Sequence, residues 1–266
     1  MKTILITGAS GGIGEALANK LAERKHNLLL VARNAEKLSA QCNQLADKFG
    51  INAQFIAADL SKPGVAEQVF SETQQRGLEV EMLINNAGVG SGGALTDIAL
   101  KAELDMLQLN ISSLVALTHL FLPQMQQRKS GTIINVASVA GFMPIPYMAT
   151  YAASKMFVRS FTEAITEECK PYNIHVMLLV PGLTRTNFNH ASGIEGVRPN
   201  VEYKDTSTQS PEQVADEALK ALDKKKPFIV SGRRNRLSTR AVALVPNAMI
   251  TKIYAKSFLK KQKNNV

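Results

Sequence analysis

The sequence contains no tryptophan and only two cysteines, Cys42 and Cys169, which lie far apart in the chain. Two cysteines without a metal-ligand spacing exclude a disulfide-rich scaffold and a zinc motif, so we expect reduced, buried thiols. The first residues, MKTILITGAS, lack the charged leader, apolar stretch and cleavage site of a secretory signal. No apolar run suggests a membrane-spanning segment. We therefore expect a cytoplasmic protein whose 266 residues build one large core.

Acidic residues are missing from the end of the chain, because none follows Asp223. The formal net charge is +9, and twelve of the 31 basic residues lie beyond that point. They are Lys224, Lys225, Lys226, Arg233, Arg234, Arg236, Arg240, Lys252, Lys256, Lys260, Lys261 and Lys263. This asymmetry is typical of a tail that meets anionic lipid, an acidic partner or nucleic acid, although a solvated basic face gives the same pattern. No recognisable nucleic-acid-reading module accompanies it, so we expect no nucleic-acid partner.

The charge pattern divides the chain into a domain over residues 1–235 and a basic extension over 236–266. Apolar residues alternate with basic ones in the extension, and Pro246 is expected to divide it. A basic amphipathic helix of this type can lie on an anionic membrane. Packing against the body or against an oligomer partner is the alternative.

Short apolar runs alternate with helical patterns throughout the domain. The expected strands are Lys2–Ile6, Asn27–Ala32, Ala53–Ala57, Glu81–Ile84, Thr132–Ala137, Ile174–Val180 and Pro227–Val230. The expected helices include Ala35–Phe49, Pro63–Arg76, Leu95–Arg128, Tyr147–Lys170 and Pro211–Asp223. Strands that alternate with helices predict an α/β fold, a doubly wound parallel sheet of about seven strands. The polar, irregular stretch 187–210 is expected to form a lid.

A glycine-rich turn directly follows the first expected strand. Residues 7–14 read TGASGGIG, and helical periodicity continues beyond them. Gly8 allows a tight turn, while Gly12 and Gly14 permit close approach of a pyrophosphate to a helix N-terminus. A strand, a glycine turn and a helix in this order predict dinucleotide binding.

Arg33 follows the second expected strand, where NAD-binding units carry an acidic residue for the ribose 2′-hydroxyl. Residues 28–33 contain no carboxylate, and a guanidinium can bind a 2′-phosphate in a bidentate manner. We therefore predict NADP (NADPH) in preference to NAD. The alternative interpretation is an arginine that merely lies on the surface.

A phenol and an ammonium, Tyr151 and Lys155, are four residues apart in a helical pattern and so share one helix face. A free phenol has a pKa of about 10, which is too high for proton exchange near neutrality. A nearby positive charge lowers that pKa. Ser138 follows the fifth expected strand, at the edge of the sheet where open α/β folds bind ligands. We predict that a hydroxyl, a phenol and an ammonium converge on one reacting oxygen.

These motifs together resemble the short-chain dehydrogenase/reductase superfamily in its single-domain form. The likeness covers about 180 residues and is carried by TGASGGIG at 7–14, Asp59, NNAG at 85–88, Asn110, Ser138, Tyr151-x-x-x-Lys155, and Pro181-Gly182 with Thr186. The resemblance implies a Rossmann-like, seven-stranded sheet, a nicotinamide cofactor and hydride transfer. It also makes a homo-oligomer the expected state.

The resemblance implies a role for each matching residue. Tyr151 would be the general acid in reduction and the base in oxidation, and Lys155 would lower the Tyr pKa and bind the nicotinamide ribose. Ser138 would hydrogen-bond the substrate oxygen, and Asn110 would hold a water that links Lys155 to solvent. The implied cofactor-binding set is Gly8, Ser10, Gly12, Ile13, Gly14, Arg33, Asp59, Asn86, Ala87, Gly88, Tyr151, Lys155, Pro181, Gly182, Thr184 and Thr186. Gly12 stands where the NADP-preferring branch sometimes carries a second basic residue.

The expected substrate mouth is apolar and offers no arginine for a carboxylate apart from Arg185. Its expected lining is Val89, Ala94, Leu95, Phe142, Met143, Ile145, Tyr147, Met148, Leu183 and Phe188. We expect an uncharged, lipophilic carbonyl or alcohol as the small-molecule substrate. Two alternatives stay open: a 3-oxoacyl-thioester reductase of lipid metabolism, and a non-catalytic NADP-binding scaffold.

Overall fold

The predicted α/β sheet is confirmed. In the computed structural model, which describes residues 1–186, 188 and 208–264, parallel strands form one seven-stranded sheet in the order β3-β2-β1-β4-β5-β6-β7. The strands are β1 (Lys2–Thr7), β2 (Leu28–Ala32), β3 (Ala53–Ala57), β4 (Glu79–Asn85), β5 (Gly131–Val136), β6 (Ile174–Val180) and β7 (Phe228–Val230). The order reverses between β1 and β4, and ligands bind at the carboxyl ends of the strands beside such a switch point.

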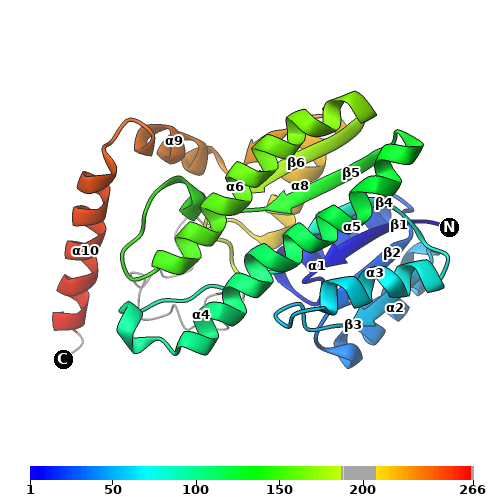
Figure 1. The fold of residues 1–266 in the computed structure, drawn as a ribbon, viewed down its shortest axis with the longest axis horizontal. Helices are drawn as coiled ribbons and strands as arrows, with labels where there is room; N and C mark the ends of the chain where they lie inside the picture. The colour runs from blue at the N-terminus through cyan, green and yellow to red at the C-terminus, as the bar shows by residue number, and fades with distance from the viewer. Residues whose placement is uncertain (187, 189–207, 265–266) are drawn as a thin grey trace.

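The central strands are largely apolar, and helices cover both faces of the sheet (Figure 1). Successive residues of a strand point to opposite faces. In β1, Ile4 and Ile6 accordingly belong to one core cluster and Leu5 to the other. All three are fully buried, as expected for a central parallel strand.

Two sets of helices supply the covering layers. The first cluster is built on α1 (Gly12–Glu23), α2 (Ala35–Phe49) and α8 (Pro211–Asp223), and the second on α3 (Val65–Gln75), α5 (Ser113–Arg128) and α6 (Ala149–Cys169). Local signals set their ends. Asn34 accepts a hydrogen bond from the Lys37 amide at the start of α2, and Gly50 ends that helix with φ of 62°. Ser210 and Gln213 form a capping box at the start of α8.

The long helical pattern over Leu95–Arg128 is divided in the structure. It comprises a 3-10 turn (Leu95–Asp97), α4 (Leu100–Leu107), a π-helical segment (Gln108–Ser112) and α5. Among the described residues, Leu100–Arg128 is also long and apolar enough to pass for a membrane-spanning helix, which the sequence pattern did not predict. Its Leu117, Phe121 and Met125 are buried against the sheet, so core packing accounts for part of the apolar composition, while Leu100 and Leu104 are exposed.

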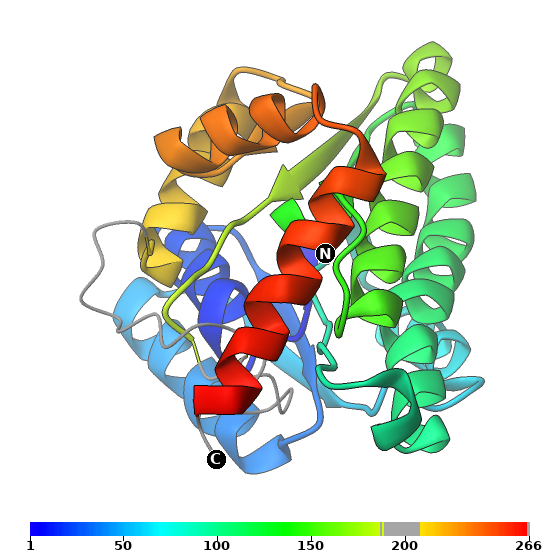
Figure 2. The same ribbon diagram turned by 90° about the vertical axis from the view of Figure 1, so that its left-hand side faces the viewer.

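The basic extension forms two helices, α9 (Arg233–Val242) and α10 (Asn247–Asn264), and the predicted break at Pro246 is confirmed. The proposed boundary after residue 235 falls inside α9. Figure 2 shows α10 crossing the end of the molecule toward which the strands point. The expected lid over 187–210 lies largely outside the described residues; at its end, Gln209 bridges back to Thr184.

Candidate active site

The glycine turn after β1 leaves no room for a side chain at Gly8 or Gly14. Gly8 has φ of 65°, and a Cβ built on it would lie 2.9 Å from the Ala87 Cα. A Cβ on Gly14 would lie only 2.4 Å from the Gly8 carbonyl oxygen. The turn therefore presents bare backbone at the N-terminus of α1, where free N–H groups favour an anion. These contacts fit the pyrophosphate of a dinucleotide, as the sequence pattern predicts.

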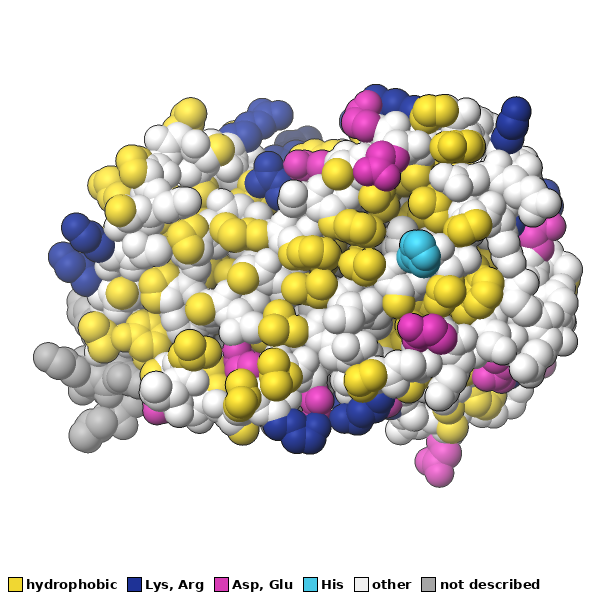
Figure 3. Space-filling model, in the orientation of Figure 1, with side chains coloured by type: hydrophobic (Ala, Val, Ile, Leu, Met, Phe, Trp, Pro, Cys, Tyr) yellow, Lys and Arg dark blue, Asp and Glu magenta, His cyan; other side chains and the backbone are white. Residues whose placement is uncertain are grey.

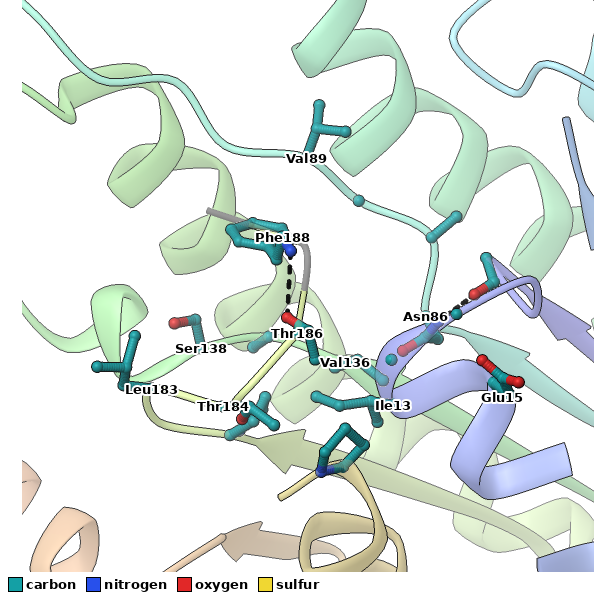
Figure 4. Close-up of a pocket in the computed structure, with 18 of the residues that line it drawn as sticks. Ile13, Glu15, Asn86, Val89, Val136, Ser138, Leu183, Thr184, Thr186 and Phe188 are labelled. Atoms are coloured by element: carbon teal, nitrogen blue, oxygen red, sulfur yellow. Dashed lines mark hydrogen bonds between the residues drawn. The ribbon is translucent and has the colours of Figure 1, made fainter. Parts of the chain in front are cut away.

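The second turn of the site, NNAG at 85–88, is fastened to the first. The Asn86 side-chain amide donates to the Thr7 carbonyl at 2.9 Å and to the Gly8 carbonyl at 3.2 Å. The Thr7 hydroxyl accepts from the backbone N–H groups of Asn86 and Ala87, both at 3.0 Å. Asn86 therefore acts as a brace between β1 and β4 at the switch point (Figure 4).

Gly14→Ala is expected to lower the free energy of unfolding by about 1–3 kcal/mol, because the new methyl group would press on fixed backbone atoms. Gly11→Ala is the matched control in the same turn. Gly11 has an extended backbone, and its Cβ would meet only the Lys37 ammonium, at 3.8 Å. Urea unfolding of both variants checks this. Equal stability of the two variants would contradict the close packing described here.

The phenol, the ammonium and the serine come from two neighbouring segments and line one cavity. Tyr151 and Lys155 lie one turn apart on α6, and Ser138 follows β5. All three are buried. The Lys155 ammonium donates to the Val136 carbonyl at 3.0 Å, and burial lowers the pKa of Lys155 from 10.5 to about 8. The Ser138 hydroxyl accepts from the Ala140 amide at 3.2 Å, so its proton is left for another acceptor.

Asn110 occupies the π-helical segment between α4 and α5, an irregularity that often marks functional sites. Its side-chain oxygen accepts from the Val89 amide at 3.0 Å, and its nitrogen donates to the Val89 carbonyl and the Ser154 hydroxyl at 2.9 and 3.1 Å. Ser154 in turn donates to the Tyr151 carbonyl at 2.7 Å. These bonds tie the segment after β4 to α6. They give Asn110 a positioning role, and its water-holding role stays a prediction.

Most of the predicted residues surround one cavity of about 530 Å³ (Figure 4). It is lined by Gly8, Ser10, Gly12, Ile13, Arg33, Asn86, Ala87, Gly88, Ser138, Tyr151, Lys155, Pro181, Gly182, Thr184 and Thr186. Asp59 lines a second cavity of about 700 Å³, which shares Gly8, Ser10, Arg33, Ala87 and Gly88 with the first. Gly14 and Asn110 line neither cavity; they pack behind the residues that do. Both volumes are in the range of small-molecule sites.

The sequence pattern missed a second cation beside Arg33. Lys37, from the first turn of α2, lines the same cavity, and its ammonium lies near Gly11. Its place in the first turn of the helix that follows Arg33 was the available signal. Gly182 also has an additional reason to be glycine, because a Cβ there would lie 2.2 Å from the Asn235 amide of α9.

The residues expected to line an apolar mouth pack in part around Tyr151; of them Val89, Leu183 and Phe188 line the cavity of about 530 Å³. Val89, Met143, Ile145, Met148 and Phe188 do pack with Tyr151 in one cluster. Ile250 of α10 is buried in the same cluster, a contribution that the residue pattern left open.

The prediction that Phe142 lines the substrate mouth is wrong. Its ring packs in a different cluster, with the Arg159 guanidinium 4.1 Å from the ring centroid. Leu95 is largely exposed to solvent. Phe142 differs from the expectation because the short 3-10 helix after Ser138 turns its ring toward α6 and β7, away from Tyr151.

Comparison with known proteins places this chain in a family. Residues 2–195 match the short chain dehydrogenase family. Dehydrogenase/reductase SDR family member 7B of Bos taurus is 32% identical over 234 residues, which cover 85% of this chain and 72% of that protein. The 7β-hydroxysteroid dehydrogenase of Collinsella aerofaciens is 30% identical over 232 residues, which cover 87% of this chain and 86% of that protein.

Solved structures agree. A 7β-hydroxysteroid dehydrogenase structure superposes with a TM-score of 0.85 at 28% identity and covers 96% of each chain. A Sphingobium yanoikuyae short-chain dehydrogenase in complex with NADPH superposes with a TM-score of 0.79 at 30% identity and covers 86% of this chain and 87% of that one. A short-chain dehydrogenase/reductase from Burkholderia phymatum in complex with NAD superposes with a TM-score of 0.77 at 26% identity and covers 90% of this chain and 92% of that one. The chain belongs to the short-chain dehydrogenase/reductase family and is an NAD(P)-dependent oxidoreductase acting on alcohol or carbonyl substrates.

Proposed function

We propose that this enzyme uses NADPH to reduce a lipophilic ketone, or oxidises the corresponding alcohol. One observation carries the proposal: Tyr151 lines the glycine-turn cavity together with Lys155 and also packs in the apolar cluster that contains Met143, Ile145 and Met148. The cavity suits a charged dinucleotide, whereas Met143, Ile145 and Met148 suit a substrate without charge. Arg185, the one arginine expected near the mouth, is engaged with the Thr208 carbonyl at 3.2 Å.

Within this proposal the side chains divide the work on the substrate oxygen. A bound nicotinamide supplies the hydride, or accepts it in the reverse direction. Tyr151 donates its phenolic proton to the carbonyl oxygen as that oxygen gains charge, and Ser138 donates a hydrogen bond to the same atom. The Lys155 ammonium stabilises the negative charge left on Tyr151. Asn110 and Ser154 hold α6 in register with the turn after β4.

We also propose that Arg33 and Lys37 together select NADPH over NADH. Both side chains line the phosphate end of the cavity beside Ser10 and Gly11. Two cations near a ribose would favour a 2′-phosphate through charge-assisted hydrogen bonds. The NADPH complex of the Sphingobium relative supports this choice, and the NAD complex of the Burkholderia relative makes a direct test necessary.

Replacing both cations, in Arg33→Ala/Lys37→Ala, is expected to raise the KM for NADPH by about a hundredfold or more, since each lost charged hydrogen bond weakens binding by about 1.5–3 kcal/mol. The KM for NADH should change little, because NADH has no 2′-phosphate. Lys48→Ala at the far end of α2 is the control. Steady-state kinetics with both cofactors give the answer. A parallel loss for NADH, or a wild-type preference for NADH, would refute the assignment.

The test of the proposed function is oxidation of NADPH measured against a panel of carbonyl compounds. The panel contains a bulky aromatic ketone, a keto steroid, a 3-oxoacyl thioester and a small charged keto acid. We expect turnover of the uncharged, bulky ketones. Preference for the thioester would favour the second candidate, a 3-oxoacyl reductase, and turnover of the keto acid alone would refute a lipophilic substrate.

A further inference from the structure

The C-terminal helices expose large aliphatic side chains. In α9, Leu237 is 67% exposed, and in the turn before α10, Leu244 is 87% exposed. In α10, Met249 and Ile253 are 57% and 56% exposed, and Leu259 is also exposed. Hydrophobic side chains gather at this end of the molecule, with Lys and Arg among them (Figure 3). A clustered set of exposed aliphatics marks an interaction surface more often than single exposed leucines do.

The opposite face of α10 is fixed to the body, so the outward face is defined. Ile250 and Phe258, two turns apart, are both buried. The Phe258 ring stacks on Tyr147 with ring centroids 3.6 Å apart and an interplanar angle of 16°. Tyr147 has a left-handed backbone, with φ of 65°, in the loop that leads into α6. Because these contacts set the rotation of α10, Met249 and Ile253 point away from the core.

The exposed face also has charge of a single sign. Residues 233–266 contain nine basic and no acidic residues. Lys252 and Lys256 alternate with Met249 and Ile253 along the outward side of α10, and Arg240 is exposed on α9. Long aliphatic stems with charged heads allow lysines to reach lipid headgroups while neighbouring side chains enter the acyl boundary.

We propose that the outward face of α9 and α10 docks on an anionic lipid bilayer. Its aliphatic residues match the interfacial region, and its uncompensated cations match anionic headgroups. A second copy of this chain fits less well, because a symmetric contact would place the basic face of α10 against itself. An acidic protein would satisfy the lysines but would not account for four exposed aliphatic residues at 237, 244, 249 and 253.

Docking in this way would set the apolar mouth beside the membrane, since α10 contributes Ile250 to the cluster that contains Tyr151. This consequence rests on the proposed function, because it would bring a lipophilic substrate to the site directly from the bilayer. The docking itself does not depend on the reaction. A binding experiment therefore tests it separately from any assay of turnover.

The experiment is co-sedimentation of the full chain with phosphatidylcholine vesicles and with mixed phosphatidylcholine–phosphatidylglycerol vesicles at low and high salt. We expect binding to the mixed vesicles, weakened by salt. Lys252→Glu/Lys256→Glu should weaken it by on the order of tenfold or more, and Met249→Ser/Ile253→Ser should also weaken it. The matched control is Lys224→Glu/Lys226→Glu, with the same change of charge at exposed lysines that precede β7, whereas α9 and α10 follow that strand.

Three results would overturn the proposal. They are no binding to the mixed vesicles, an equal loss in the Lys224→Glu/Lys226→Glu control, and unchanged binding in both α10 variants. Light scattering of the protein without vesicles measures its oligomeric state and tests whether the face is instead a contact between copies. If Met249→Ser/Ile253→Ser converts a larger assembly to monomers, the face is a contact between copies, and the lipid assignment is wrong. Far-ultraviolet circular dichroism of each variant confirms that the fold is retained, as expected at exposed positions.

Discussion

Tyr151→Phe is expected to lower kcat by about a hundred- to ten-thousand-fold, because the variant has no proton to donate to the substrate oxygen. The substitution removes one oxygen from a buried ring whose centroid lies 5.8 Å from the centroid of the Phe188 ring, so the packing of the two rings should persist. NADPH binding should change little, since the glycine turn and the cations beside it are untouched. Single-turnover kinetics, with cofactor binding measured separately, resolve the two effects.

The matched control is Tyr172→Phe, which removes the same hydroxyl from a half-exposed tyrosine after α6. It should retain full activity. A Tyr151→Phe enzyme that keeps more than about a tenth of the wild-type rate would exclude Tyr151 as the proton donor. Full retention of the cellular function in the inactive variant would instead favour the scaffold interpretation.

Lys155→Met is expected to abolish turnover and yet to stabilise the cofactor-free protein. The fall in the pKa of Lys155 from 10.5 to about 8 corresponds to about 3 kcal/mol for burying the ammonium. Loss of the hydrogen bond to the Val136 carbonyl offsets about 1 kcal/mol of that gain. At pH 7 the free energy of unfolding should therefore rise by about 2 kcal/mol.

The gain should depend on pH in a defined direction. Below pH 8 the lysine is protonated in both the folded and the unfolded chain, so the full cost of burial is present. Between pH 8 and 10.5 the unfolded chain binds more protons, and wild-type stability recovers as pH rises. Urea unfolding at pH 7 and pH 9.5 should show the advantage of Lys155→Met shrinking, with Lys224→Met as an exposed control. An advantage that grows with pH, or destabilisation at pH 7, would contradict the buried charge.

The sheet could be predicted from the sequence because local patterns determine it. Each strand is a short apolar run, and turn or capping residues such as Gly50 and Ser210 mark the helix ends. The glycine turn and the pair Tyr151 and Lys155 depend on spacings within one element and its neighbour. Features of this kind can be predicted without knowledge of the contacts between distant segments.

Other features depend on contacts between distant segments, and no local pattern reveals them. The π-helical segment at Asn110 follows from its bonds to Val89 and Ser154. Phe142 turns toward Arg159 because of how the 3-10 helix meets α6. The stacking of Phe258 on Tyr147 joins residues more than a hundred positions apart. An amphipathic pattern in α10 could not show which of its faces would meet the body.

In the proposed reaction a hydride reaches the carbonyl carbon of the substrate while Tyr151 supplies the proton to its oxygen. Turnover of a bulky ketone with NADPH deuterated at the transferable position of the nicotinamide, followed by mass spectrometry of the alcohol, tests both steps. We predict one deuterium on the carbinol carbon with the wild-type enzyme and a trace product with Tyr151→Phe. Unlabelled alcohol, or NADPH binding without label transfer to any carbonyl of the panel, would contradict the proposed reaction.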